Sequence, residues 1–281
     1  MASRTIVLTG ASDGVGAAAA RLLAAHGSRV VLVGRSPTKT RALGAELGAP
    51  SHVADFADLA QVRALAAELL AAYPRIDVLA NNAGAIMAAR RVTADGFEAT
   101  FQVNHLAPFL LTALLTDRLV ESGASLVQTS SVAARRYGRL DLDDLQLERD
   151  YSPNRAYGDA KLANVLFTTE LQRRLGPRGV NAVAFHPGMI ATSFAAGSTS
   201  WFRLVYRTPL ARLVLEPAER GGERLVRLAE GTPGVTWVPG AYYEGDAVAS
   251  AGPQARDDDL ARELWDRSAA LLGLQRGARS E

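Results

Sequence analysis

Short apolar stretches alternate with longer amphipathic or Ala-rich stretches along most of the chain, and this alternation restricts the fold more than any other feature. The first stretch, Thr5–Thr9, is β-branched or apolar throughout, which is typical of a strand buried on both faces. Strands that alternate with helices of ten or more residues indicate a parallel sheet covered by helices on both faces. We therefore predict an α/β fold, a doubly wound parallel sheet of about seven strands, in a single domain spanning residues 1–281.

The boundaries of the elements follow from the same pattern. The predicted strands are Thr5–Thr9, Arg29–Val33, Ser51–Ala54, Asp77–Ala80, Ser125–Thr129, Val180–Phe185 and Ala241–Tyr243. The predicted helices are Gly14–His26, Thr38–Leu47, Leu59–Ala72, Gly96–Leu119, Ala156–Leu175, Pro217–Ala229 and Asp257–Leu272. The regularity fades after Pro187, where we predict a substrate lid around residues 190–216. Trp201 and Phe202 in this segment are costly to expose unless they cover something; the alternative is that both pack permanently in the core.

Composition excludes several classes of function. The chain has no cysteine, which rules out disulfides, thiolate metal sites and a cysteine nucleophile. Its four histidines lack the spacing of metal ligands, so we predict no metal. The net charge is only +2 and the basic residues are scattered, which argues against nucleic acid as a partner. No apolar run approaches the roughly 20 residues that cross a bilayer, and the first strand begins too early for a secretory signal. We expect a cytoplasmic protein without a membrane anchor.

A glycine-rich loop with the spacing Gly-x-x-x-Gly-x-Gly connects the first predicted strand to the first predicted helix. Glycines permit a tight turn and a close approach of pyrophosphate to the backbone, while the helix N-terminus supplies N–H groups and the positive end of its dipole. An ordinary βα turn is the alternative, but the strand–loop–helix context favours a nucleotide site. The residues expected to contact the nucleotide here are Gly10, Ser12, Asp13, Gly14, Val15 and Gly16.

The end of the second strand bears on the choice of coenzyme. A carboxylate there would accept hydrogen bonds from the ribose hydroxyls of NAD, whereas this chain has Gly34-Arg35-Ser36. Arg35 can pair with a 2′-phosphate through two parallel hydrogen bonds. We predict NADP(H) as the coenzyme, with NAD(H) as second choice. The alternative is that Arg35 is a solvated loop residue.

Tyr157 and Lys161 lie four residues apart, so they share one face of a helix. A free tyrosine has a pKa of about 10, too high for a base near neutrality. A nearby ammonium favours the phenolate and so lowers that pKa. Tyr157 could then donate a proton to a developing alkoxide, or accept one in the reverse direction. On spacing alone, an ordinary surface pair is the alternative.

These motifs together resemble the short-chain dehydrogenase/reductase family over roughly residues 5–245. The resemblance rests on the glycine spacing, on Asn81-Asn82-Ala83-Gly84 after the fourth strand, and on Tyr157-x-x-x-Lys161 after the fifth. It implies a Rossmann-type fold and hydride transfer between coenzyme and substrate. The chain departs from the family at Ala160, where a serine is usual. It also has Asp13 where many NADP-using relatives carry a second basic residue, which argues against a strict preference for NADP.

The resemblance also implies roles for individual residues. The implied catalytic residues are Asn104, Ser131, Tyr157 and Lys161, with Ser130 as a second choice for the serine because neighbouring strand residues face opposite ways. The further residues implied to bind the coenzyme are Asp55, Phe56, Asn82, Ala83, Gly84, Tyr157, Lys161, Pro187, Gly188, Ile190 and Thr192. Asn104 would hold a water that relays protons to the lysine.

Within the family the chain is most similar to the retinol dehydrogenase and WW-domain oxidoreductase branch. The similarity lies in Asp141–Leu145, Ala156-Tyr157, Lys161–Phe167 and Glu170-Leu171. The 26 positions that separate Ser131 from Tyr157 indicate an insertion on the substrate side. The similarity implies an oxidoreductase that interconverts a lipophilic ketone or aldehyde and an alcohol. Two alternatives stay open, a coenzyme-binding regulator without catalysis and an alcohol dehydrogenase that prefers NAD. An epimerase or dehydratase is disfavoured by the spacing of the glycine loop.

The helix that follows Tyr157 is apolar on more than one face. Its apolar residues, Leu162, Val165, Leu166, Phe167 and Leu171, cannot all pack on the sheet. The family resemblance implies that this helix and the preceding long helix pair across a two-fold axis. We therefore expect a homodimer or a homotetramer.

Overall fold

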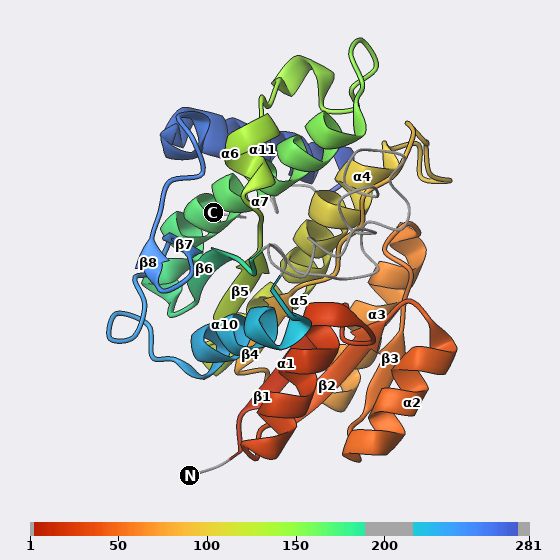
Figure 1. Cartoon of the computed structure of the whole chain (residues 1–281), viewed down its shortest axis with the longest axis vertical. Helices are drawn as coiled ribbons and strands as arrows, with labels where there is room; N and C mark the ends of the chain where they lie inside the picture. The colour runs from red at the N-terminus through yellow and green to blue at the C-terminus, as the bar shows by residue number, and fades with distance from the viewer. Residues whose placement is uncertain (1–2, 189–215, 275–281) are drawn as a thin grey trace, which may run out of the picture.

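The computed structural model of the chain describes residues 3–188 and 216–274. One eight-stranded sheet forms its centre, with seven parallel strands and a last strand antiparallel to its neighbour (Figure 1). In spatial order the strands are β3 (Ser51–Val53), β2 (Arg29–Gly34), β1 (Thr5–Thr9), β4 (Val78–Asn81), β5 (Ser125–Thr129), β6 (Asn181–His186), β7 (Tyr242–Glu244) and β8 (Ala247–Val248). The predicted doubly wound α/β fold is confirmed, and the two-residue β8 is the strand that sequence patterning missed.

Helices connect the parallel strands. They are α1 (Gly14–Ala25), α2 (Pro37–Leu47), α3 (Leu59–Ala72), α4 (Ala99–Phe101), α5 (Ala107–Ser122), α6 (Ala133–Tyr137), α7 (Pro153–Leu175), α10 (Ala218–Glu230) and α11 (Asp258–Leu271). A π-helical segment, Gln102–Leu106, joins α4 to α5, and single 3₁₀ turns occur at Leu142–Asp144, Gly176–Arg178 and Gln254–Arg256. No described helix is both long enough and apolar enough to cross a membrane.

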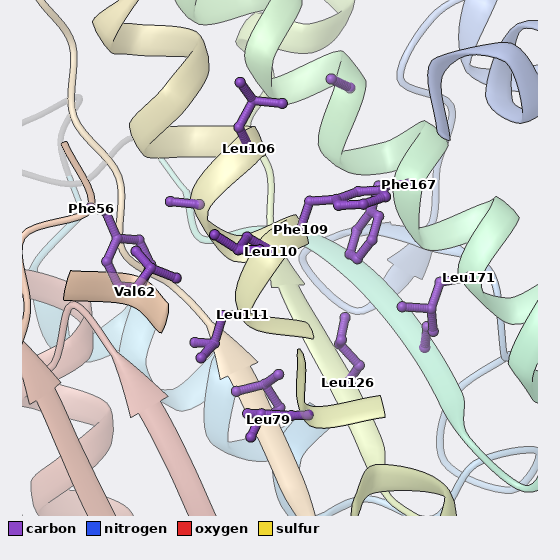
Figure 2. Packing of buried hydrophobic residues seen from close by; sticks show 14 of the residues in the cluster. Phe56, Val62, Leu79, Leu106, Phe109, Leu110, Leu111, Leu126, Phe167 and Leu171 are labelled. Atoms are coloured by element: carbon purple, nitrogen blue, oxygen red, sulfur yellow. The ribbon is translucent and has the colours of Figure 1, made fainter. Parts of the chain in front are cut away.

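Two hydrophobic layers cover the two faces of the sheet, and alternate side chains of β1 enter one layer or the other. Ile6 and Leu8 point to the face that α1, α2 and α10 cover, whereas Val7 points to the face covered by α3, α5 and α7. All three are fully buried, as expected where side chains of a central strand alternate between two covered faces. Figure 2 shows the second layer, where α5 and α7 bring Phe109 and Phe167 together.

Helix α11 packs on α7 and covers apolar side chains that the sheet does not reach. Trp265 stacks on Phe167, with 5.6 Å between ring centroids and an angle of 11°, and meets the ring of Phe109 at 4.8 Å. The guanidinium of Arg174 lies 4.9 Å from the Trp265 ring centroid. The chain thus supplies its own cover for this face of α7.

This cover bears on the expected self-association. The five apolar residues of α7 on which that expectation depended, Leu162, Val165, Leu166, Phe167 and Leu171, are all at most 4% exposed within one chain. Their burial therefore needs no second copy. Self-association stays a prediction, without this argument for it.

The helices differ in places from those predicted from the sequence. The helix predicted over Gly96–Leu119 begins at Ala99, because Glu98 caps it by accepting hydrogen bonds from the N–H groups of Thr100 and Phe101. Helix α6 falls in a region where no helix was predicted. The predicted lid around 190–216, with Trp201 and Phe202, lies outside the described residues except for Glu216.

Candidate active site

The parallel strands end at one edge of the sheet, and the predicted site residues follow those ends. Gly10 follows β1, Arg35 follows β2, Asn82 follows β4 and Ser130 follows β5, while Pro187 follows β6. The carboxyl edge of an open parallel sheet is where such folds bind ligands. The topology therefore brings residues separated by up to 177 positions to one edge of the molecule.

The glycine loop packs tightly against the turn after β4. A Cβ on Gly16 would lie 2.1 Å from the Gly10 carbonyl oxygen, and a Cβ on Gly10 would lie 2.8 Å from the Cα of Ala83. Gly10 also has a φ of +65°, which disfavours other residues. The Asn82 amide donates to the Thr9 carbonyl at 3.1 Å, and the Thr9 hydroxyl accepts from the N–H groups of Asn82 and Ala83 at 3.0 Å each. Only glycine therefore fits at positions 10 and 16.

Asp13 caps the N-terminus of α1. Its Oδ1 accepts a hydrogen bond of 2.8 Å from the N–H of Gly14, and its Oδ2 lies 2.6 Å from the Nζ of Lys39. Ser12 lies beside the end of β2, because a Cβ on Gly34 would be 2.8 Å from its hydroxyl oxygen. The glycine loop and the start of α2 thus form one continuous surface.

Arg35 and Asp55 are both accessible at the strand ends, whereas Phe56 is not. Arg35 is exposed directly after β2. Asp55 accepts a hydrogen bond of 3.0 Å from the N–H of Ala57 and remains partly exposed. The Phe56 side chain is buried in the core beside Val62 (Figure 2), so only its backbone is left to contact a coenzyme.

Lys161 is buried beside the aromatic ring of Tyr157. Its Nζ lies 5.5 Å from the Tyr157 ring centroid and donates a hydrogen bond of 3.1 Å to the Thr129 carbonyl. Asn164, one turn further along α7, donates to the same carbonyl at 3.2 Å. Lys161 is 2% exposed, and this burial lowers the pKa of its ammonium to about 7. Tyr157 is only partly buried, so it connects the lysine to the surface.

The two serines after β5 have different surroundings. Ser130 is 1% exposed, and its hydroxyl donates to the Lys161 carbonyl at 2.7 Å, which ties β5 to α7. Ser131 is partly exposed, and its hydroxyl oxygen accepts a hydrogen bond of 3.2 Å from the N–H of Ala133 at the start of α6. Ser131 is therefore the serine whose hydroxyl hydrogen can be offered to a substrate.

Asn104 lies in the π-helical segment and is fully buried. Its Nδ2 donates to the carbonyls of Ala85 and Thr100, at 2.7 and 2.8 Å, and its Oδ1 accepts from the N–H of Ala85 at 3.3 Å. Both amide hydrogens are thus engaged, so a relay water at Asn104 would have to donate a hydrogen bond to one of its oxygens. Single-turn π-helices are frequent at functional sites.

Arg224 from α10 holds the turn after β6. It donates a hydrogen bond of 2.7 Å to the Pro187 carbonyl and pairs with Glu216 at 2.8 Å. Gly188 has a φ of +106°, and a Cβ there would lie 2.2 Å from the Arg224 guanidinium. The remaining two residues predicted to bind the coenzyme, Ile190 and Thr192, lie outside the described residues.

Comparison with known proteins agrees with this geometry. The family model for short chain dehydrogenase matches residues 4–202, which is most of the chain. The chain belongs to the short-chain dehydrogenase family. It is 43% identical to a proposed daunorubicin C-13 ketoreductase of Streptomyces sp. (strain C5), covering 96% of this chain and 93% of that protein.

Two further short-chain dehydrogenase comparisons cover nearly the whole chain. Human retinol dehydrogenase 13 is 36% identical over 97% of this chain and 85% of its own length. A crystal structure of an uncharacterized protein from Mycobacterium paratuberculosis is 33% identical, with a TM-score of 0.75, covering 97% of this chain and 94% of that one. The protein is therefore an oxidoreductase of the family that acts on ketones and alcohols with a nicotinamide coenzyme.

The described residues fit such a coenzyme. Gly84 packs directly against the lysine, since a Cβ there would lie 2.6 Å from the Asn104 Oδ1 and 3.3 Å from the Lys161 Nζ. The ammonium carries three hydrogens, and the one acceptor found for it among the described residues is the Thr129 carbonyl, so further N–H groups can reach ribose hydroxyls. Residues 3–188 and 216–274 contain no cluster of three acidic or histidine side chains that could hold a metal.

Sequence reasoning missed three residues that position this short-chain dehydrogenase site. Thr9 fixes the turn after β4, Asn164 shares the carbonyl that holds the lysine, and Arg224 holds the turn after β6. Thr9 directly precedes the glycine loop, and Asn164 lies one helical turn after Lys161. Both could therefore have been predicted from their distance in sequence to known motif residues. Arg224 lies 36 residues beyond Gly188 and could not have been predicted in this way.

Proposed function

We propose that this chain interconverts a ketone or aldehyde and an alcohol by hydride transfer with NADP(H), using Tyr157 as the general acid and base. The observation that carries the proposal is the buried Lys161 ammonium against the Tyr157 ring, held by the Thr129 carbonyl at 3.1 Å. Burying the Lys161 ammonium destabilises the folded chain, because removing a charge from water is unfavourable. A role in catalysis explains its position better than a role in stability. Perturbed titratable groups of this kind are typical of catalytic sites.

Each catalytic residue has a definable task in this proposal. The nicotinamide coenzyme supplies or accepts the hydride. Tyr157 donates a proton to the developing alkoxide during reduction and accepts one during oxidation. The positive charge of Lys161 favours the phenolate form of Tyr157, and its pKa of about 7 allows it to return a proton at neutral pH. Ser131 donates a hydrogen bond to the substrate oxygen, where negative charge develops.

The preference for NADP(H) is supported by Arg35. Its guanidinium is exposed directly after β2, and Gly34, Arg35 and Ser36 contribute no carboxylate that would repel a 2′-phosphate. Arg35→Ala should weaken NADPH binding by about 1–3 kcal/mol, as for other charge-assisted contacts, and leave NADH binding nearly unchanged. Fluorescence titration of both coenzymes measures this. Equal losses for the two coenzymes would show that Arg35 does not contact the phosphate.

The substrate is proposed to be a carbonyl group on a bulky, largely apolar molecule. The names of two relatives refer to a C-13 ketone of daunorubicin and to retinol. A screen of NADPH and NADH oxidation against aldehydes, ketones, steroids and retinal would identify the substrate class. Coenzyme binding without turnover of any compound would favour the alternative of a catalytically silent regulator.

Tyr157→Phe tests the catalytic assignment. Turnover should fall by at least about 100-fold, the usual scale for loss of a general acid, while coenzyme affinity should change little. Tyr73→Phe is a matched control, because Tyr73 follows the C-terminus of α3 and so lies at the opposite edge of the sheet, where its hydroxyl pairs with His52 at 3.1 Å. Near-normal turnover in Tyr157→Phe would show that another group is the acid.

A further inference from the structure

His105 is a buried histidine among aromatic rings. It lies in the π-helical segment and is 1% exposed. Its ring packs at centroid distances of 5.0, 6.0 and 6.3 Å on Phe101, Phe109 and Phe167. Burial lowers the pKa of the imidazole to about 4, so the ring is uncharged at pH 7 and carries a single N–H hydrogen. A phenylalanine could pack here without burying two polar nitrogens, so packing alone does not explain the histidine.

Each ring nitrogen of His105 faces one polar side chain. The Nε2 lies 2.9 Å from the hydroxyl oxygen of Ser268 in α11. The Asn164 side chain raises the pKa of His105, as an acceptor beside a ring N–H does. The His105 Nδ1 and the Asn164 Oδ1 are both buried, and neither has another hydrogen-bond partner among the described residues. These two atoms therefore form the second contact.

The Thr129 carbonyl determines the direction of these hydrogen bonds. It can only accept, so Asn164 presents its Nδ2 to this carbonyl, at 3.2 Å, and its Oδ1 to the ring. The Oδ1 also can only accept, so the single hydrogen of His105 lies on Nδ1. The Nε2 then accepts from the Ser268 hydroxyl. With this direction, every buried polar atom between Ser268 and Thr129 has a partner.

The same direction keeps an acceptor away from Lys161. The Lys161 Nζ and the Asn164 Nδ2 donate to one carbonyl, at 3.1 and 3.2 Å, so the two groups are neighbours. The ammonium carries three hydrogens, of which the Thr129 carbonyl uses one. If the Asn164 amide turned over, its Oδ1 would take the place of Nδ2 and could accept an unused hydrogen of Lys161. The contact with His105 prevents this exchange.

We infer that His105 is a positioning residue of the catalytic site: its Nδ1–H holds the Asn164 Oδ1 and so keeps this acceptor away from the Lys161 ammonium. The remaining N–H groups of Lys161 are then left for the coenzyme. Ser268 completes the chain of hydrogen bonds, so α11 supports the catalytic lysine as well as covering α7. The inference rests on the proposed role of Lys161 in catalysis, but its tests do not require turnover.

The position of the His105 hydrogen can be observed by nitrogen-15 NMR. The chain has four histidines, and comparison with His105→Phe assigns the signals of this ring. The unmodified chain at pH 7 should show a protonated Nδ1 and an unprotonated Nε2. A hydrogen on Nε2 would overturn the inference, because the Asn164 Oδ1 would then lack its donor.

The pKa of Lys161 tests the consequence. The chain has two lysines, so lysine labelled with carbon-13 at Cε reports Lys161 alone in a Lys39→Arg background. In His105→Phe the freed amide should turn over and accept from the ammonium. This favours the charged form and should raise the pKa of Lys161 by about 1. Adding Asn164→Leu should cancel the rise, because leucine offers no acceptor. An unchanged pKa in His105→Phe would overturn the inference.

Two comparisons exclude a merely structural effect. An equal rise in the His105→Phe and Asn164→Leu double variant would overturn the inference, because it would indicate that water enters a loosened core. His52→Phe is the matched control, since this histidine lies on β3 and contacts Tyr73 at 3.1 Å; it should leave the pKa of Lys161 unchanged.

The outcomes also separate this inference from the proposed function. Near-normal turnover in Tyr157→Phe would contradict the proposed catalytic role of that tyrosine and would leave the NMR results on His105 as they are. Loss of turnover in Tyr157→Phe, together with a pKa of Lys161 that His105→Phe does not move, would overturn only the role of His105.

Discussion

Replacing Lys161 by methionine should abolish turnover and stabilise the coenzyme-free protein. Methionine has a similar unbranched length but carries no charge. The Thr129 carbonyl would lose the lysine as a donor yet keep the 3.2 Å hydrogen bond from Asn164, so no buried acceptor is left unpaired. The substitution therefore removes a desolvated charge without opening a cavity or orphaning a backbone group.

The expected gain follows from the pKa of the ammonium. Burial lowers it from 10.5 to about 7, so between these values the unfolded chain binds more protons than the folded chain. Stability then rises with pH across this window, and the unfavourable contribution of Lys161 is about 4 kcal/mol at pH 7 but only about 2 kcal/mol at pH 9. The lost hydrogen bond removes about 1 kcal/mol. Lys161→Met should be more stable than the original chain by about 3 kcal/mol at pH 7 and about 1 kcal/mol at pH 9.

Urea denaturation at the two pH values measures this difference. Comparing the two proteins at each pH cancels the other titrating groups, so the decrease of about 2 kcal/mol isolates Lys161. Lys39→Met is the control, since an exposed lysine should show almost no change at either pH. A stability difference that is the same at pH 7 and pH 9, or a variant less stable at both, would refute the reasoning.

Three further predictions concern the supports of the site. Trp265→Ala should lower the free energy of unfolding by about 3 kcal/mol, because it removes the stack on Phe167, and urea denaturation measures this. Burial raises the pKa of the Asp159 carboxyl to about 6, so the carboxylate destabilises the folded chain increasingly as pH rises from 4 to 6. Asp159→Asn should therefore raise the free energy of unfolding by up to about 3 kcal/mol at pH 7.5 and change it little at pH 4. Melting temperatures at the two pH values measure this. Arg224→Gln should weaken NADPH binding about 10-fold by freeing the Pro187 carbonyl, as fluorescence titration would show; an unchanged Kd would contradict a role for this turn in coenzyme binding.

Most of the fold was predictable because each strand is short, apolar and bounded by turn residues. The start of α7 was predicted three residues late. The signal was present, because serine is a common N-cap residue and proline is common at the first position of a helix, as in Ser152-Pro153. The π-helical segment was not predictable from hydrophobic periodicity, because Gln102–Leu106 are all buried and show no exposed face. Strand β8, two residues long, is too short for any periodic pattern.

The candidate site was predictable where it depends on sequence neighbours and less so where it depends on tertiary contacts. The spacing of Tyr157 and Lys161 predicts a shared helix face, and the structure brings the ammonium to the ring. The spacing alone does not reveal that Lys161 is buried, since its ammonium lies between the end of β5, at Thr129, and the turn after β4, at Gly84. The distinction between Ser130 and Ser131 likewise depends on which hydroxyl meets the α7 backbone.

The position of α11 has a consequence for how the protein is made. The roughly 100 residues from the end of α7 to the end of α11 take about 5–20 s to synthesise at 5–20 residues per second. During that interval Trp265 is not yet available to cover the rings of Phe109 and Phe167, so chaperones and proteases can bind this surface. Limited proteolysis of ribosome-bound chains halted before residue 257 should cut α7, whereas chains halted after release of α11 should resist. A chain whose synthesis stops before α11 therefore exposes aromatic side chains by which proteases and chaperones can recognise it as incomplete.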